Sequence, residues 1–176
     1  MRKSSTFTFT PHADRDIVVT RVFDARREVL WNAFTKPEII KRWMSGPPAG
    51  ALTIREMDLR AGGAYRWEWR REALGPAMGL SGVFREVSKP ERIVHTEKWD
   101  QPWYVGETVV TTAFAEQGGK TALTLTIRYE SRAARDGIAK SAIKSGIKSG
   151  MAIGMAQCYE RLEELLASAE ADNMAS

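Results

Sequence analysis

The sequence predicts one α+β domain in which a curved, seven-stranded antiparallel sheet wraps around a long C-terminal helix. Seven segments carry the alternating or β-branched residues typical of strands, and short turn sequences separate the last six. Beyond Tyr129 the apolar residues recur every three or four positions, which is the period of an amphipathic helix. A chain of 176 residues with 43% hydrophobic residues is long enough to bury a core without disulfides or metals.

The N-terminal part of the chain predicts a tail, one strand and two short helices. Residues 1–14 are polar and aperiodic, so we expect a flexible tail. Residues 17–23 are rich in β-branched side chains and predict the first strand. Asp24 is placed to cap a first helix, and Thr35-Lys-Pro-Glu38 has the spacing of a capping box for a second. The Gly-Pro-Pro run at 46–48 must end that second helix.

Six further strands are expected in close succession. The breaks between them contain the glycine, proline and aspartate residues of turns, and such short connections imply an antiparallel meander. The Gly118-Gly119 pair fits a hairpin turn better than a phosphate-binding loop, because the earlier glycine of that motif is missing. The six expected strands cover residues 52–59, 64–70, 80–87, 93–99, 107–114 and 122–129.

A long helix over about residues 132–167 is expected to cover the inner face of the sheet, because its apolar stripe must be buried. Gly146, Gly150 and Gly154 recur along it, although each glycine costs a helix about 1 kcal/mol relative to alanine. Either the helix packs closely on another backbone, which we favour, or the missing side chains leave room for a ligand. Residues 169–176 predict a second flexible tail, which leaves 15–168 as the folded domain.

Composition excludes several classes of function. Cys158 is the single cysteine, so no internal disulfide can form, and His12 and His95 offer no metal-ligand spacing. We therefore expect no metal and no cofactor. No apolar run is long enough for a signal peptide or a membrane span, which predicts a cytoplasmic protein. A net charge of +4 is too small and too dispersed to indicate a nucleic-acid partner.

Several short segments, in their order along the chain, resemble the activator-of-heat-shock-protein-ATPase-like family of the START-like (SRPBCC) superfamily. The most characteristic is Asp58-Leu-Arg-Ala-Gly-Gly63; Arg21-Val-Phe-Asp-Ala25, Pro90-Glu-Arg-Ile93 and Thr96-Glu-Lys-Trp99 support it. The resemblance spans about residues 15–168 and implies a helix-grip fold. It also implies two kinds of role, since the family includes a co-chaperone domain and the superfamily includes lipid carriers, hormone receptors and aromatic cyclases.

Two strands carry the candidate functional residues. On each of them side chains two positions apart share one face of the sheet, and which face of strand 93–99 points inward is left open by the sequence. An aromatic stripe of this kind forms either ordinary core or the wall of a ligand cavity. The residues expected to line such a cavity are Trp43, Tyr65, Trp67, Trp69, His95, Glu97, Trp99, Met151 and Met155.

Three functions compete. The leading hypothesis is a non-catalytic module, monomer or homodimer, that binds a small apolar or aromatic molecule. The second is an interaction protein with a chaperone partner, and the third is a cyclase- or hydrolase-type enzyme that uses His95 and Glu97. We expect no catalytic residue, because no nucleophile or third orienting group accompanies the pair. Their backbones lie about 7 Å apart along a strand, which favours two groups facing a common ligand over a direct proton relay.

Overall fold

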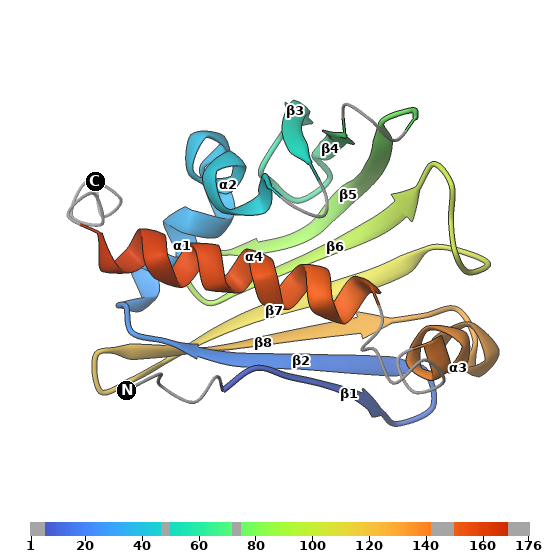
Figure 1. Cartoon of the computed structure of the whole chain (residues 1–176). Coiled ribbons are helices and arrows are strands. Elements are labelled where there is room, and N and C mark those ends of the chain that lie inside the picture. The colour runs from blue at the N-terminus through green and yellow to red at the C-terminus, as the bar shows by residue number, and fades with distance from the viewer. Residues whose placement is uncertain (1–5, 47–49, 72–74, 142–149, 169–176) are drawn as a thin grey trace.

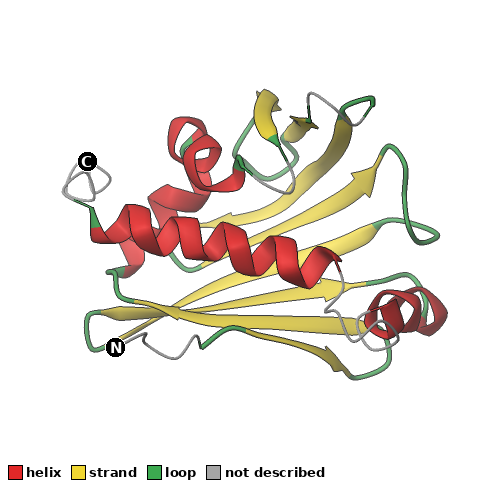
Figure 2. Ribbon diagram, in the orientation of Figure 1, coloured by secondary structure: helices red, strands yellow, loops and turns green. Residues whose placement is uncertain are grey.

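The computed structural model describes residues 6–46, 50–71, 75–141 and 150–168, and within these it forms an α+β fold with eight strands and four helices. All eight strands belong to one antiparallel sheet that is not closed, in the order β1-β2-β8-β7-β6-β5-β4-β3. Figure 1 shows α4 running across one face of this sheet, with α1 and α2 beside it, and Figure 2 shows α3 at one end of the strands. We call the face toward α4 the inner face.

The elements follow the predicted order, apart from an additional first strand and the division of the last helix into two. The strands are β1 (Thr8–His12), β2 (Asp16–Phe23), β3 (Ala51–Met57), β4 (Ala64–Arg70), β5 (Met78–Ser88), β6 (Arg92–Trp99), β7 (Thr108–Gln117) and β8 (Lys120–Arg128). The helices are α1 (Arg27–Thr35), α2 (Pro37–Met44), α3 (Arg132–Ser141) and α4 (Gly150–Ala167). None of the helices within the described ranges is long and apolar enough to cross a membrane.

The predicted count of seven strands is wrong, because β1 forms within residues 1–14, the segment expected to be a tail. Its backbone pairs with β2 from Thr8↔Thr20 to His12↔Asp16, and Phe9 packs against the core. The sheet is also more than a meander, since β2 pairs with β8, the last strand in the sequence. An edge strand such as β1 needs little more than a neighbour's free backbone groups, so its own sequence signal is weak.

Both predicted helix caps are wrong. The helix α1 begins at Arg27, so that Arg26 rather than Asp24 occupies its N-cap. The N-cap of α2 is Lys36, without a side-chain capping bond, because Thr35 still belongs to the last turn of α1. The Thr35 hydroxyl donates to the carbonyl of Trp31 at 2.8 Å, the local back-bonding that threonine makes inside a helix.

The predicted helix over 132–167 is described as two helices, α3 and α4, and residues 142–149, Gly146 among them, lie outside the described part of the chain. The side chain of Arg135 on α3 is buried, and its Nη1 donates to the carbonyls of His12, Ala13 and Asp16 at 3.0–3.3 Å. The helix α3 thereby holds the turn between β1 and β2, while α4 crosses the inner face (Figure 1).

The helix α4 is anchored to the inner face by one aromatic residue and one ion pair. The ring of Tyr159 is fully enclosed, and four other rings have their centroids within 5.6–6.4 Å of it, those of Phe7, Phe23, Phe34 and Trp43. On β2, two residues before Phe23, the buried guanidinium of Arg21 donates to the carboxylate of Glu163 at 2.5 Å. These contacts fix the spacing between helix and sheet, and therefore the depth of the space between them.

Acid should weaken the β2–β8 pairing through Asp16. Arg128 donates to both oxygens of the buried Asp16 carboxylate at 2.9 and 3.0 Å, and this hydrogen bonding lowers the pKa of Asp16. The folded pKa therefore lies below the unfolded one, and the stability that Asp16 contributes is present above about pH 4 and lost as the pH falls through the folded pKa.

Melting temperatures measured by circular dichroism between pH 7 and pH 3 test this effect. We expect Asp16→Asn to lower the melting temperature at pH 7 and to flatten its fall below pH 4. The exposed Asp14, in the turn before Asp16, supplies the control variant Asp14→Asn. If the melting temperature of Asp16→Asn falls with pH as steeply as that of the wild type, Asp16 does not cause the loss of stability in acid.

Candidate functional site

A polar pair from β6 lies on the inner face of the sheet. The register between β6 and β7 places His95 opposite Val110 and Glu97 opposite Thr108, and both of these partners are fully buried. Because direct partners on antiparallel strands share a face, His95, Glu97 and Trp99 point inward. The register thus settles the orientation that the sequence left open.

The two side chains of the pair touch. His95 Nε2 and Glu97 Oε1 are 3.3 Å apart, and the side chains are 18% and 17% exposed. The backbone spacing that argued against a direct relay therefore does not keep the two side chains apart. Parallel projection from a strand separates the backbones, but both side chains are long enough to converge.

Tyr65 of β4 lies against the histidine. Its ring centroid is 5.5 Å from that of His95 and 5.6 Å from that of Trp67. Its hydroxyl crosses β5 at Gly82 and donates to the carbonyl of Thr96 on β6 at 2.5 Å. A side chain at position 82 would block this path, since a Cβ there would lie 1.9 Å from that carbonyl oxygen. The glycine therefore brings the aromatic residues of β4 next to the polar pair of β6.

A row of tryptophans connects this place with the surface. Neighbouring ring centroids are 6.2 Å apart for Trp67–Trp69, 5.7 Å for Trp69–Trp99 and 5.4 Å for Trp99–Trp103. Trp69 is held in place by its indole N–H, which donates to the carbonyl of Met44 at 3.1 Å. Trp103, in the loop between β6 and β7, is 64% exposed. The aromatic residues thus extend from the polar pair to solvent.

The charge of Glu97 acts on several buried phenol groups. Burial raises the pKa of Tyr104 to about 12, and the charge of Glu97 adds to the rise. Burial also raises the pKa values of Tyr65 and Tyr129, again with a contribution from Glu97. Tyr104 and Tyr129 stack edge to face with centroids 5.0 Å apart, and the Tyr129 hydroxyl lies 3.9 Å from the sulfur of Met151 on α4. The phenols therefore stay neutral at physiological pH.

Besides Arg21 Nη1 on β2, three buried polar atoms on the inner face of the sheet lack a hydrogen-bond partner among the residues that the structure describes. They are Trp67 Nε1 on β4, His95 Nδ1 on β6 and Thr108 Oγ1 on β7. Such atoms are rare in folded proteins, and each costs about 1–3 kcal/mol when left unpaired. Trp67 and His95 both contact the ring of Tyr65, and Thr108 is the direct partner of Glu97. Trp67 and His95 therefore both neighbour Tyr65, and Thr108 neighbours Glu97, although the register places Trp67 level with Trp99, four residues along β6 from His95.

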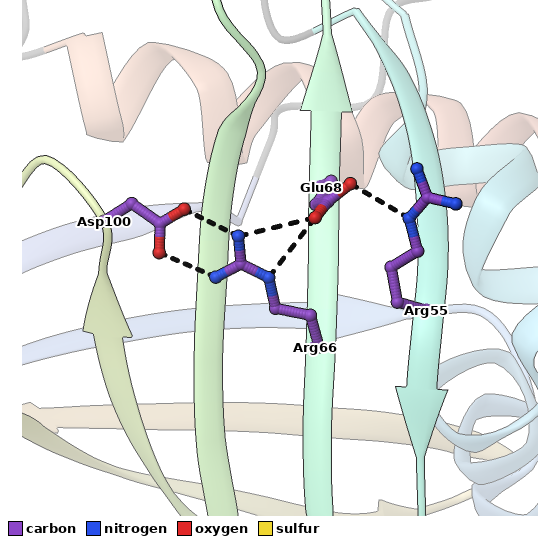
Figure 3. A network of polar contacts seen from close by, with 4 residues as sticks. All are labelled: Arg55, Arg66, Glu68 and Asp100. Carbon is purple, nitrogen blue, oxygen red and sulfur yellow. Dashed lines mark hydrogen bonds and ion pairs between the residues drawn. The ribbon is translucent and has the colours of Figure 1, made fainter.

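The outer face of the same strands carries an independent polar network. Figure 3 shows Arg66 donating to both oxygens of Asp100, at 2.6 Å each, and to Glu68, which also accepts from Arg55 at 3.0 Å. The Arg66 guanidinium passes over Gly79 of β5, where a Cβ would lie 2.3 Å from Arg66 Nη2. These charges are thus committed to the outer face and are not available to Glu97.

The remaining predicted wall residues fall in other places. Trp43 lies in the cluster around Tyr159, and its indole N–H donates to the carbonyl of Ala33 at 2.8 Å. Met155 is half-buried against the core. At Gly154 the favoured interpretation of close backbone packing is wrong, because a Cβ at this position would meet nothing within 4 Å. The absent side chain of Gly154 leaves open space instead.

Sequence reasoning missed Tyr104, Thr108 and Tyr129 as members of the site. Thr108 carried a usable signal, because it alternates with Val110 and Thr112 along a predicted strand beside Glu97. Tyr104 carried no such signal, because loop residues have no periodicity that shows which way a side chain points. The loop also borders a surface hollow of about 280 Å³, which it shares with α3. The hollow is lined by Trp103, Tyr104, Val105, Ser131, Ala133, Ala134 and Gly137.

Comparison with known proteins finds one family and several similar folds. Residues 24–167 match the family described as "Activator of Hsp90 ATPase homolog 1-like protein". A crystal structure from Rhodobacter sphaeroides is 28% identical, with a TM-score of 0.78, and the match covers 92% of this chain and 98% of that one. A search of curated proteins found no match.

Two further structures support the fold alone, because their sequence identity is below 25%. A protein from Chromobacterium violaceum is 24% identical with a TM-score of 0.71, and the match covers 89% of this chain and 99% of that one. A protein from Mycobacterium smegmatis is 19% identical with a TM-score of 0.74, and the match covers 91% and 97%. The arrangement of strands and helices therefore recurs in proteins with few residues in common.

Proposed function

Because the chain belongs to the activator of Hsp90 ATPase homolog 1-like family, we propose that it is a non-catalytic domain that holds a small apolar or aromatic molecule between its sheet and α4. The family and its START-like fold fit either a ligand-binding or a co-chaperone-like domain. The observation that carries the choice of ligand binding is the row of inward-facing aromatic side chains that are only half-buried, with the unpaired buried atoms Trp67 Nε1 and His95 Nδ1 along it.

The apolar side chains between the sheet and α4 suit a ligand with apolar faces. Trp67 and Trp99 are only half-buried although both point inward, and Met151 and Met155 on α4 are half-buried as well. Ligand sites in proteins combine such apolar walls with a few polar groups that fix orientation. Methionine also adapts to varied shapes, which suits a permissive wall.

The absence of catalysis follows from the chemistry of the pair. An acid–base pair acts on a bound substrate when a nucleophile or a stabiliser of developing charge accompanies it. The hydroxyl of Tyr65 already donates to the carbonyl of Thr96, and the described inner face of β4, β6 and β7 carries no serine, cysteine or lysine as a nucleophile beside the pair. The pair is therefore suited to orient a polar group of the ligand.

Tryptophan fluorescence, titrated with fatty acids, flavonoids and polycyclic aromatics, tests the binding function. We expect a saturable change with at least one class, because Trp67 and Trp99 line the site. His95→Ala should weaken that binding about tenfold, the loss that follows when a buried hydrogen bond is left unmade. The matched control is Arg55→Ala on the outer face, which should leave the affinity unchanged.

Two results would overturn the proposal. A chain that gives no saturable change with any of the three classes is not a carrier of apolar molecules. Turnover in an ester or epoxide hydrolysis screen, lost in a folded His95→Ala variant, would establish the enzyme instead.

A co-chaperone-like role is the second candidate, and the loop between β6 and β7 favours it. Trp103 and Val105 are 64% and 83% exposed beside the hollow next to α3, and exposed apolar groups of this size mark interaction surfaces. A chaperone ATPase assay with the wild type and the double variant Trp103→Ala/Val105→Ala tests this role. Stimulation that the double variant loses would favour it, and equal rates with and without the wild type would exclude it.

A further inference from the structure

We infer that the outer face of β2, β8 and β7 is the interface of a homodimer in which a two-fold axis relates the two copies. The inference goes beyond the proposed binding function, which uses the inner face of the sheet alone. It follows from the residues that point outward from these three strands, from the area that they cover and from the charges at their border.

The outer face of these three strands carries no charged residue over a wide area. The register defines its rows: Val22 of β2 stands opposite Ala122 of β8, which stands opposite Ala115 of β7. The same face of β3 and β4, by contrast, carries the charged network of Figure 3. Interfaces are distinguished by a centre that is depleted of charged residues. Every outward residue is valine, threonine or alanine over 18–22 of β2, 122–126 of β8 and 109–115 of β7, and we call this surface the uncharged patch.

No helix within the described ranges covers the uncharged patch. Figure 1 shows α1, α2 and α4 on the inner face of the sheet and α3 at the end of the strands. Val22 is accordingly 38% exposed, and Ala115 in the same row is exposed as well. Apolar side chains that lie together on one uncovered face mark an interaction surface.

The uncharged patch has the size of the centre of a stable dimer interface. Thr8 and Thr10 extend it onto β1, and Val94 extends it onto β6, so that it spans five strands. Neighbouring strands lie about 4.8 Å apart and alternate residues about 7 Å, so five strands and three rows cover about 24 by 20 Å, or roughly 500 Å². A stable interface buries about 800 Å² on each partner, including a polar rim. The patch and the rim around it together supply that area.

A second copy of the same chain is the partner that this surface fits. An uncharged patch meets its own copy without repulsion, and threonine hydroxyls both donate and accept hydrogen bonds, so identical rows are complementary. The charges at two borders are already paired within one copy. Arg128 contacts Asp16 at 2.9 Å at one end of the patch, and Arg92 contacts Glu86 at 3.5 Å beside β6. Two sheets pack face to face about 10 Å apart, a spacing that short side chains allow.

Sedimentation velocity of the full chain at about 1–100 µM tests the inference, and we expect the dimer to predominate at the upper end of this range. Thr124 lies at the centre of the patch, with Thr20 and Ala113 on either side. Thr124→Lys and Thr124→Glu should each raise the dissociation constant at least about 100-fold, because two like charges would meet near the axis. An equimolar mixture of the two variants should associate again, because opposite charges then face each other.

The matched control is Thr53→Lys, which makes the same change at an exposed outward position of β3, outside the patch. This variant should dimerise like the wild type, and circular dichroism confirms that all variants are folded. A wild type that stays monomeric at about 100 µM overturns the inference. A dimer that survives Thr124→Lys, or that is lost equally in Thr53→Lys, overturns the assignment to this face. A mixture of the Lys and Glu variants that stays monomeric contradicts the two-fold arrangement.

Discussion

Replacement of Tyr159 by alanine should lower the free energy of unfolding by about 3–5 kcal/mol, the range for truncating a large aromatic side chain in a core. Tyr159 is the residue of α4 that reaches furthest into other elements, with rings from the N-terminal segment, β2, α1 and α2 around it. Its loss would leave a cavity between α4 and the sheet. For a domain of this size the melting temperature should fall by roughly 6–20 °C.

The control for Tyr159→Ala is Tyr159→Phe, which keeps the ring and removes the hydroxyl. Burial raises the pKa of this hydroxyl, so a neutral group is removed, and we expect a change of about 1 kcal/mol or less. Chemical denaturation followed by circular dichroism measures both variants. An equal loss in the two would assign the effect to the hydroxyl, and an unchanged Tyr159→Ala would show that α4 is held elsewhere.

Replacement of Gly82 by alanine should cost about 3 kcal/mol or more, because two penalties combine. A Cβ at this position would lie 1.9 Å from the carbonyl oxygen of Thr96, a backbone atom that cannot rotate away. It would also lie 2.7 Å from the ring and hydroxyl of Tyr65, so the bond between Tyr65 and Thr96 would be lost and a buried hydroxyl left unpaired. Ligand affinity should fall with it, since Tyr65 supports His95 and Trp67.

Gly154→Ala is the matched control for Gly82→Ala, because the same methyl group is added where it meets nothing within 4 Å. Alanine favours a helix over glycine by about 1 kcal/mol, so this variant should melt at a higher temperature than the wild type. Thermal melts of both variants measure these two changes in stability. A Gly82→Ala protein as stable as the wild type would mean that Tyr65 reaches β6 by another path.

Much of the fold was predictable because each inner strand is amphipathic. Residues 64–70 form a strand with the predicted bounds, and their alternation predicted that Arg66 would lie opposite to Tyr65 and Trp67. In the turn before them, Arg60 pairs with Asp58 at 2.8 Å. Alternation fixes which residues share a face, and the face with the larger aromatic residues is the buried one.

The remainder depended on tertiary contacts that leave no local pattern. The strand β1, for example, pairs with an edge of β2 that no other strand occupies. Strand 93–99 carries polar and aromatic residues on the same face, so its sequence does not show which face points inward. Its register with β7, which places His95 beside Val110, settles that question. The orphaned atoms are likewise invisible in a sequence, because a missing partner is a property of the packed structure.

The pairing of β2 with β8 has a consequence for biosynthesis. It joins residues as far apart as Asp16 and Arg128, which are 112 positions distant in the sequence. At about 5–20 residues per second, a ribosome leaves one edge of β2 without its partner for roughly 5–20 s. During that interval an apolar strand with free backbone groups is open to other nascent chains. The β1–β2 hairpin shields only one of its two edges, so protection by folding chaperones matters most before β8 emerges.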